Sequence, residues 1–303
     1  MEPAAATTIL VLLLAAAVAV SARGGAERAP TLVFILAGQS NMGGRGGATS
    51  GNRWDGVVPP ECAPSPRTLR LSPSLRWEEA REPLHAGVDA GNVVGVGPGM
   101  PFAHALLRSP ACPRGAVVGL VPCAQGGTPI ANWSRGSELY DRMVTRARVA
   151  GAGTGTGKKI AALLWFQGEA DTLRREDALA YAGRMEAFVR DVRRDLALPN
   201  LLVIQVCPSV MATPATSMDD VSIALAPLIS VVKYVGIATA QWQGNKQGKW
   251  LDLVRKEQRA VRVANLKYVD AMGLPIANDI THLTTQAQVR LGKMLADAYI
   301  STL

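Results

Sequence analysis

A hydroxyl, a carboxylate and an imidazole, the groups that nucleophilic catalysis combines, occur at Ser40, Asp279 and His282. Acyl transfer to a serine needs a base that takes the hydroxyl proton and a carboxylate that orients the base. Asp279 precedes His282 by three residues, so a single turn can bring the carboxylate against the imidazole. A serine at such a position also caps helices very often, so Ser40 by itself leaves the nucleophile and the helix cap equally open.

Two further turns offer donors for the negatively charged oxygen that forms when an ester is attacked. The backbone amides of Ser40 and Gly127 and the side-chain amide of Gln167 are the candidate oxyanion donors. We assign a supporting or substrate-contacting role to four neighbours, Gln39, Arg45, Gly126 and Glu169. For Arg45, contact with substrate and a structural clamp remain equally open. For Glu169, holding its own turn is favoured over direct catalysis.

These polar residues follow short apolar runs that are typical of buried strands. Five such runs predict strands, at residues 31–37, 116–121, 160–166, 201–206 and 266–269. Helical spacing predicts helices at residues 102–107, 177–196, 249–264 and 285–299, the last opened by a capping box of Thr285 and Gln288. Strands that alternate with helices predict an α/β fold with a parallel sheet covered on both faces. The turns at the carboxyl ends of such strands meet at one edge of the sheet.

Residues 48–99 contain many prolines and glycines and predict a long irregular loop that sets the choice of substrate. The whole chain has 303 residues, of which 48% are hydrophobic and 18% charged, as in a globular protein, and one domain over residues 29–303 is the simplest account. The net charge is +8, but the basic residues are scattered and aromatic residues make up only 5%. We therefore expect no nucleic-acid partner.

The amino terminus resembles a secretory signal. Residues 7–20 are apolar, and the small residues Val20, Ser21 and Ala22 suit a cleavage site, which predicts a signal peptide over residues 1–22. We expect a secreted protein, extracellular or in the cell wall, without stable membrane insertion once the signal is removed. The alternative is a single membrane anchor, for which the run is short, and finding residues 1–20 in the mature protein would favour it.

The four cysteines, Cys62, Cys112, Cys123 and Cys207, are too widely spaced for a C-x-x-C metal site. One or two disulfides and free buried thiols both remain open, and the sequence does not choose among the pairings. Cys123 ends an apolar run and is typical of a core position.

Four motifs occur in order along the chain: Gly38-Gln39-Ser40-Asn41-Met42, Gln125-Gly126-Gly127-Thr128-Pro129-Ile130 with Trp133, Trp165-Phe166-Gln167-Gly168-Glu169, and Asp279-Ile280-Thr281-His282-Leu283. Together they resemble the SGNH hydrolases, and more closely the sialate O-acetylesterase-like group and the plant members of carbohydrate esterase family six, which include acetyl xylan esterase-like proteins. The resemblance extends from about Ala29 to the carboxyl terminus.

The resemblance implies a three-layer α/β/α sandwich with a flavodoxin-like parallel sheet of about five strands, no metal or other cofactor, and deacetylation of sugar hydroxyls. It also implies that Ser40, Asp279 and His282 form the triad and that Gly127 and Gln167 complete the oxyanion hole. Residues 207–235 depart from the pattern, because an apolar, unpatterned run separates a strand from the turn that should follow it. A surface insertion and a retained intron both remain open, and tryptic peptides spanning residues 211–233 would eliminate the intron.

From these residues we expect a serine esterase that removes O-acetyl groups from a carbohydrate through an acyl-enzyme. The substrate would be an acetylated carbohydrate or a small acetyl ester. The alternatives are a general carboxylesterase, an inactive carbohydrate-binding relic of the fold, and a wall-anchored interaction protein. Neither the acetylated substrate nor the oligomeric state follows from the sequence.

Overall fold

A computed structural model describes residues 29–49, 53–151, 159–208 and 248–303. The predicted signal peptide, residues 1–22, lies outside the described residues. So does the predicted insertion at 207–235, apart from Cys207 and Pro208 at its start. The helices and strands that carry the four motifs all lie within the described ranges.

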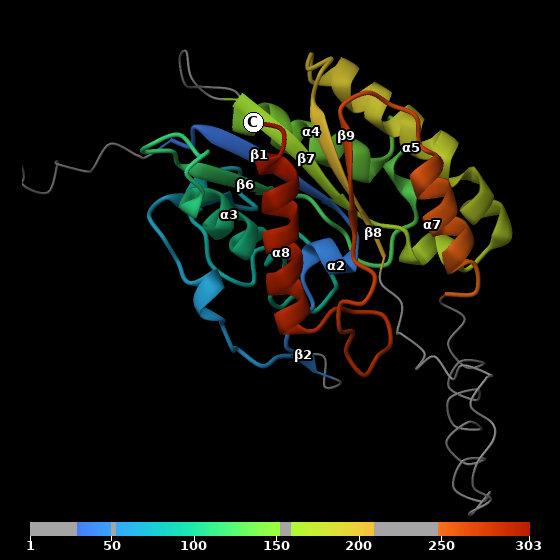
Figure 1. Ribbon diagram of the computed structural model, residues 1–303, viewed down its shortest axis with the longest axis horizontal. Coiled ribbons are helices and arrows are strands. Elements are labelled where there is room, and N and C mark those ends of the chain that lie inside the picture. The colour runs from blue at the N-terminus through green and yellow to red at the C-terminus, as the bar shows by residue number, and fades with distance from the viewer. Residues whose placement is uncertain (1–28, 50–52, 152–158, 209–247) are drawn as a thin grey trace, which may run out of the picture.

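A seven-stranded sheet forms the centre of the protein, in the order β5-β4-β6-β1-β7-β8-β9 (Figure 1). Its strands are β1 (Leu32–Gly38), β4 (Thr68–Leu71), β5 (Trp77–Glu79), β6 (Val118–Pro122), β7 (Lys159–Phe166), β8 (Leu202–Cys207) and β9 (Leu266–Asp270). All neighbours are parallel except β4 and β5. The five predicted strands are therefore confirmed, and their order, β6-β1-β7-β8-β9, is the flavodoxin-like order 2-1-3-4-5.

Two strands of the sheet, β4 and β5, come from the stretch that the sequence analysis expected to be irregular. That expectation was wrong for part of residues 48–99, which also contains the small ladder of β2 (Ala48–Thr49) and β3 (Arg53–Trp54) and the 3-10 turn η1 (Pro60–Cys62). The strands are only two to four residues long. Such short segments carry little periodic signal, and pairing with distant strands stabilises them instead.

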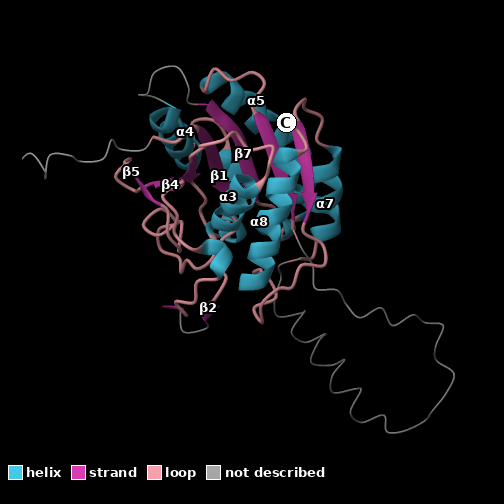
Figure 2. Ribbon diagram, turned by 60° about the vertical axis from the view of Figure 1, so that its left-hand side comes forward, coloured by secondary structure: helices cyan, strands magenta, loops and turns pink. Residues whose placement is uncertain are grey.

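Helices cover both faces of the sheet (Figure 2). They are α2 (Ser40–Gly43), α3 (Gly99–Arg108), α4 (Glu138–Gly151), α5 (Arg175–Asp195), α7 (Leu251–Ala260) and α8 (Thr285–Ile300), with 3-10 turns η2 (Ile130–Trp133) and η3 (Glu169–Thr172). Helices α3 and α8 pack against each other on one face, and α5 packs against α7 on the other. The sequence analysis did not predict α4, whose outer face is strongly charged.

The unbroken apolar run of β1 is explained by its place between the two helical layers. Phe34 and Leu36 belong to the core beneath α3 and α8, whereas Val33, Ile35 and Ala37 belong to the core beneath α4, α5 and α7. All five side chains are fully buried. Because a strand points alternate side chains to opposite faces, a strand covered on both faces has no position left for a polar residue.

Helix α8 begins at the predicted residue, Thr285, but its cap lies one residue before the predicted capping box. Its N-cap is Thr284, whose hydroxyl accepts a hydrogen bond from the Ala287 amide. Gln288 does not return to the cap. Its Nε2 donates instead to the backbone oxygen of Asn41, 3.2 Å away, beside Ser40. The side chain that the pattern assigned to local capping thus joins α8 to the turn that carries Ser40.

All four cysteines are buried and free, so no disulfide forms among them, and Cys123 is a core residue as expected. Within the described ranges, none of the helices combines the length and apolarity that crossing a bilayer requires.

Gly38 ends β1 at a point where no other residue fits. Its φ of +124° is unfavourable for L side chains, and a Cβ there would overlap the carbonyl oxygen of Phe166 on β7. The close approach lets the Gln39 amide donate to the same carbonyl oxygen at 2.9 Å. Gly38 therefore determines how closely the turn that carries Ser40 follows the sheet.

We expect Gly38→Ala to lower the free energy of unfolding by about 3 kcal/mol or more, because it adds both backbone strain and an overlap with Phe166. Gly136→Ala is the matched control, since Gly136 also has positive φ, +84°, but nothing lies within 4 Å of its Cβ position. It should cost only about 1 kcal/mol. Urea denaturation of both variants measures the difference, and equal losses would contradict the overlap.

Candidate active site

Three turns meet at the carboxyl edge of the sheet, after β1, β6 and β7. The Gln39 amide donates to Phe166 O on β7, and the Gln125 amide donates to Gly38 O on β1, 3.0 Å away. These backbone bonds hold the three turns at fixed distances from one another. The polar motifs that are far apart in the sequence are therefore neighbours at the topological switch point of the sheet.

Ser40, His282 and Asp279 form a continuous hydrogen-bonded chain. His282 Nε2 lies 2.8 Å from Ser40 Oγ, and His282 Nδ1 lies 2.6 Å from Asp279 Oδ2. Ser40 is buried, whereas the His282 side chain is 25% exposed and the Asp279 side chain 51%. Ser40 is the first residue of α2 and Gln39 is its N-cap, without a side-chain capping bond, so the helix-cap alternative for Ser40 is wrong.

The electrostatics of Asp279 determine which ring nitrogen of His282 carries the hydrogen. Burial raises the pKa of Asp279, but hydrogen bonds from the His282 ring and from the backbone amides of His282 and Thr281 outweigh it and lower the pKa to about 2. The ionised carboxylate can only accept hydrogen bonds. Nδ1 of the neutral ring must therefore donate to Asp279, which leaves Nε2 to accept the hydrogen of the Ser40 hydroxyl.

Two of the predicted oxyanion donors are backbone amides with no acceptor among the described residues, those of Ser40 and Gly127. Gly127 is exposed and has φ of +72°, with nothing within 4 Å of its Cβ position. The amide of Ser40 belongs to the first turn of α2, where intrahelical acceptors are missing. Both groups are thus available to a bound oxygen.

Gln167, the third predicted donor, is fully buried and already has protein acceptors. Its Nε2 lies 2.5 Å from Asp171 Oδ2, 3.0 Å from Thr128 O and 3.2 Å from Gln39 Oε1. In this arrangement Gln167 joins the turns after β1, β6 and β7 to one another. Donation to an oxyanion would require it to give up one of these bonds.

Arg45 pairs with a buried carboxylate that the sequence analysis did not single out, Asp89. Arg45 Nη2 lies 2.6 Å from Asp89 Oδ2, and the side chains are 7% and 0% exposed. Arg45 Nη1 donates to Gly44 O at 2.9 Å. Of the two alternatives for Arg45, substrate contact and structural clamp, its contacts in the structure match the structural clamp.

Asp89 also holds the turn that carries Gly127. Its Oδ1 accepts hydrogen bonds from the Gly126 amide at 2.9 Å and from Gln125 Nε2 at 3.0 Å. A Cβ at Gly126 would lie 2.5 Å from Arg45 Nη2, so the guanidinium packs directly against a position that has room only for glycine. The ion pair thus connects the segment after Ser40 to the turn of Gly126 and Gly127.

Glu169 is buried beside the triad and accepts a hydrogen bond from Asn41 Nδ2 at 2.6 Å. Burial raises the pKa of Glu169, while the Asn41 hydrogen bond and the charge of His282 lower it. Within the described residues, the Glu169 carboxylate forms its hydrogen bond with Asn41 and none with Ser40, Asp279 or His282. In the described ranges, no group of three or more His, Cys, Asp and Glu side chains is arranged to hold a metal ion.

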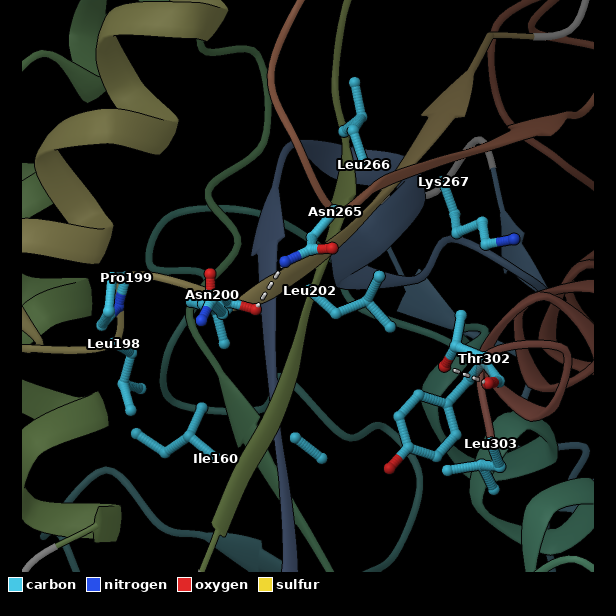
Figure 3. A pocket seen from close by; sticks show the side chains of 13 residues that line it. Ile160, Leu198, Pro199, Asn200, Leu202, Asn265, Leu266, Lys267, Thr302 and Leu303 are labelled. Atoms are coloured by element: carbon cyan, nitrogen blue, oxygen red, sulfur yellow. Dashed lines mark hydrogen bonds between the residues drawn. The ribbon is translucent and has the colours of Figure 1, made fainter.

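A hollow of about 430 Å³ lies far from these residues, at the amino ends of β7, β8 and β9 (Figure 3). The side chains of Ile160, Leu202 and Leu266 and the last residues of the chain line it. Two of its polar side chains are paired locally: Asn265 Nδ2 donates to Asn200 O at 3.3 Å, and Thr302 Oγ1 donates to Tyr299 O at 2.7 Å. The hollow is lined by no histidine, cysteine, aspartate or glutamate side chain, and Ser40, His282 and Asp279 lie at the opposite edge of the sheet.

Residues 30–301 match the family described as "Carbohydrate esterase, sialic acid-specific acetylesterase". The chain is also 44% identical over 277 residues to the protein named "Probable carbohydrate esterase At4g34215" of Arabidopsis thaliana, across 90% of this chain and 91% of that one. The chain belongs to this carbohydrate esterase family. The predicted resemblance to the sialate O-acetylesterase-like group is thereby confirmed.

Solved structures agree with this carbohydrate esterase fold. A structure of the Arabidopsis thaliana protein AT4G34215 matches with a TM-score of 0.73 and 43% identity, over 90% of this chain and 98% of that one. NanS matches with a TM-score of 0.60 and 17% identity over 91% and 97% of the two chains, which shows the shared fold alone. As a member of the family, the protein is a carbohydrate acetylesterase, a carboxylic ester hydrolase.

Sequence reasoning missed three buried polar residues of this esterase, Asn41, Asp89 and Asp171. Asn41 belongs to the motif of Ser40, and Asp171 follows the motif of Gln167 by two residues, so both lie close in sequence to predicted site residues. Asp89 lies in the loop of residues 48–99, without a motif of its own. All three are at most 4% exposed, and their hydrogen bonds reach residues that are distant in the chain.

We expect Arg45→Ala to lower the free energy of unfolding by about 3–5 kcal/mol, because it leaves the Asp89 carboxylate buried and unpaired. Arg81→Ala is the control, since Arg81 pairs with Glu79 at 2.7 Å but the two side chains are 67% and 37% exposed. It should cost less than about 1 kcal/mol. Urea denaturation of the two variants measures both values, and a comparable loss in the two would contradict the buried clamp.

Asp171 predicts a pH dependence of stability. Burial raises the pKa of Asp171 from its usual 3.8 to about 6, against the opposing hydrogen bonds from Gln167 and the Ile130 amide. The folded state therefore binds a proton on Asp171 more tightly than the unfolded chain does. This difference stabilises the folded state fully below about pH 4, and the stabilisation is lost as the pH rises towards 6.

Asp171→Asn retains an acceptor oxygen and cannot ionise. Relative to the wild type, the variant should gain up to about 3 kcal/mol of unfolding free energy between pH 3.5 and pH 7. Denaturant titrations at both values of pH measure the change. A difference between variant and wild type that does not vary with pH would show that Asp171 titrates alike in the folded and unfolded states.

Proposed function

We propose that this carbohydrate acetylesterase is a serine esterase that works through an acetyl-enzyme formed on Ser40. The observation that carries the proposal is the unbroken chain of hydrogen bonds from Ser40 Oγ through the His282 ring to Asp279. It supplies a nucleophile, a base with the required tautomer and an ionised carboxylate in one line. A relic that only binds carbohydrate has no use for this complete arrangement.

In the first half of the reaction, Ser40 Oγ attacks the acetyl carbonyl carbon while His282 Nε2 takes the hydroxyl proton. The carbonyl oxygen becomes an oxyanion, which the amides of Ser40 and Gly127 stabilise. Asp279 remains ionised and stabilises the imidazolium. When the bond to the sugar oxygen breaks, His282 returns its proton to that oxygen, and the carbohydrate leaves with a free hydroxyl.

In the second half, a water molecule attacks the acetyl group on Ser40 while His282 Nε2 takes a proton from the water. Collapse of the second oxyanion intermediate breaks the bond to Ser40 Oγ, which recovers its hydrogen from His282, and acetate leaves. The exposed side of His282 gives the water a path to the ring, since that side chain is 25% accessible to solvent.

An acetylated carbohydrate is the substrate class that the family membership supports. The family description names sialic acid, whose carboxylate an arginine would suit. However, Arg45 is committed to Asp89 and Gly44, so it is not the group that would recognise such a carboxylate. Secretion after removal of residues 1–22 belongs to the same proposal, and sequencing the amino terminus of the mature protein tests it.

We expect Ser40→Ala to abolish acetate release from p-nitrophenyl acetate and from acetylated xylan, with a loss in kcat of about 10⁴-fold or more. Ser134→Ala, at an exposed serine, is the control and should retain wild-type activity. Acetate release is measured for both substrates and for an O-acetylated sialic acid.

Each outcome of this experiment separates two candidates. Activity that survives in a folded Ser40→Ala variant would contradict the acetyl-enzyme. Cleavage of p-nitrophenyl acetate without release of acetate from any carbohydrate would favour a general carboxylesterase. A folded but inactive wild type would favour the binding relic.

A further inference from the structure

Asn41, the residue after Ser40, connects the nucleophile turn to the loop of His282. Its side chain is buried, 2% exposed. Asn41 Nδ2 donates to Thr281 O at 3.2 Å, and its Oδ1 accepts from the Leu283 amide at 2.9 Å. The two hydrogen bonds of the Asn41 side chain therefore hold the backbone on either side of His282.

Hydrogen bonds within the loop of His282 hold its shape, and Leu283, directly after His282, is fully buried in the core. Asp279 Oδ1 accepts from the amides of Thr281 and His282, and the Ala277 amide donates to His282 O at 2.7 Å. These bonds all run between neighbours in the loop. The Asp279 side chain is also half exposed, so packing does not confine it.

We propose that Asn41 is a positioning residue that fixes His282 against Ser40, and that Glu169 holds the Asn41 amide in the orientation that this requires. The proposal rests on the proposed function, because it assumes that His282 is the base. It assigns no contact with substrate to either residue. The role of Asn41 is to set the distance between nucleophile and base.

The orientation of the Asn41 amide follows from its three partners. Its Nδ2 faces two acceptors, Glu169 Oε1 at 2.6 Å and Thr281 O, while its Oδ1 faces the Leu283 amide, a donor. A rotated amide would place oxygen against two oxygens and an NH₂ group against an N–H. Glu169 is 7% exposed, and its Oε2 has no hydrogen-bond partner within the described residues. A buried carboxylate oxygen without a hydrogen-bond partner destabilises the folded state. That the protein keeps Glu169 there supports a specific role for this residue.

Asn41→Ala removes all three hydrogen bonds of the side chain but substitutes none of Ser40, His282 and Asp279. A displacement of about 1 Å at a reacting group costs about 100-fold in rate. We therefore expect kcat for p-nitrophenyl acetate to fall about 100-fold while KM stays within about 3-fold, since Asn41 does not face the substrate. Asn132→Ala, at an exposed asparagine, is the matched control and should behave as wild type.

A double-mutant cycle with His282→Ala separates positioning from general structural damage. If Asn41 acts through His282, then adding Asn41→Ala to His282→Ala should lower the residual rate by less than about 3-fold. A full 100-fold loss in the His282→Ala background would overturn the proposal. So would a wild-type kcat in Asn41→Ala. If His282→Ala alone retains wild-type activity, the proposed function fails first, which is a distinguishable result.

Charge variants test the pair directly and cover a folding failure of Asn41→Ala. Asn41→Asp keeps the acceptor for the Leu283 amide but turns a carboxylate towards Glu169, so kcat should again fall about 100-fold. Glu169→Gln keeps an acceptor for Asn41 and should retain more than a tenth of kcat. The double variant Asn41→Asp, Glu169→Gln should recover part of the loss. A wild-type rate in Asn41→Asp would overturn the positioning role. So would circular dichroism spectra showing that every Asn41 variant is unfolded.

Discussion

Buried carboxylates organise the carboxyl edge of the sheet. Asp89, Glu169 and Asp171 are each at most 7% exposed, and each accepts hydrogen bonds from the turns that form the site. Asp89 holds the turn of Gly126, Asp171 holds Gln167 and the Ile130 amide, and Glu169 holds Asn41. A desolvated carboxylate is a strong acceptor that can bind several donors at once, so it can fix irregular backbone where no ladder of strand bonds exists.

This arrangement has an energetic cost, because burial disfavours the charged form of each group. Burial raises the pKa of both Glu169 and Asp171. Asp89 is compensated differently, by the guanidinium of Arg45 at 2.6 Å. The protein thus places groups that weaken folding directly beneath its reactive residues, as is common where a site must be rigid before substrate arrives.

The two ends of the hydrogen-bonded chain from Ser40 to Asp279 are held by different physical means. Ser40 is buried and lies at the end of a strand packed on both faces, so the core sets its position. Asp279 and His282 lie in a loop where their side chains are 51% and 25% exposed, so water competes for their hydrogen bonds, although Leu283 beside them is buried in the core. For that half, the bonds of Asn41 to Thr281 O and to the Leu283 amide add to the packing of Leu283.

The amino-acid sequence by itself determined the five core strands and the order of the site motifs along them, and it predicted that Ser40, Asp279 and His282 act together. These depend on local signals, namely apolar runs that end at glycine turns and a carboxylate three residues from a histidine. Only the tertiary structure decided that Arg45 clamps Asp89, that Gln167 is bonded to Asp171, that Gln288 reaches Asn41 and that β4 and β5 extend the sheet. The reason is that a long polar side chain has several partners within reach in principle, and the choice is made by burial and by residues distant in the chain.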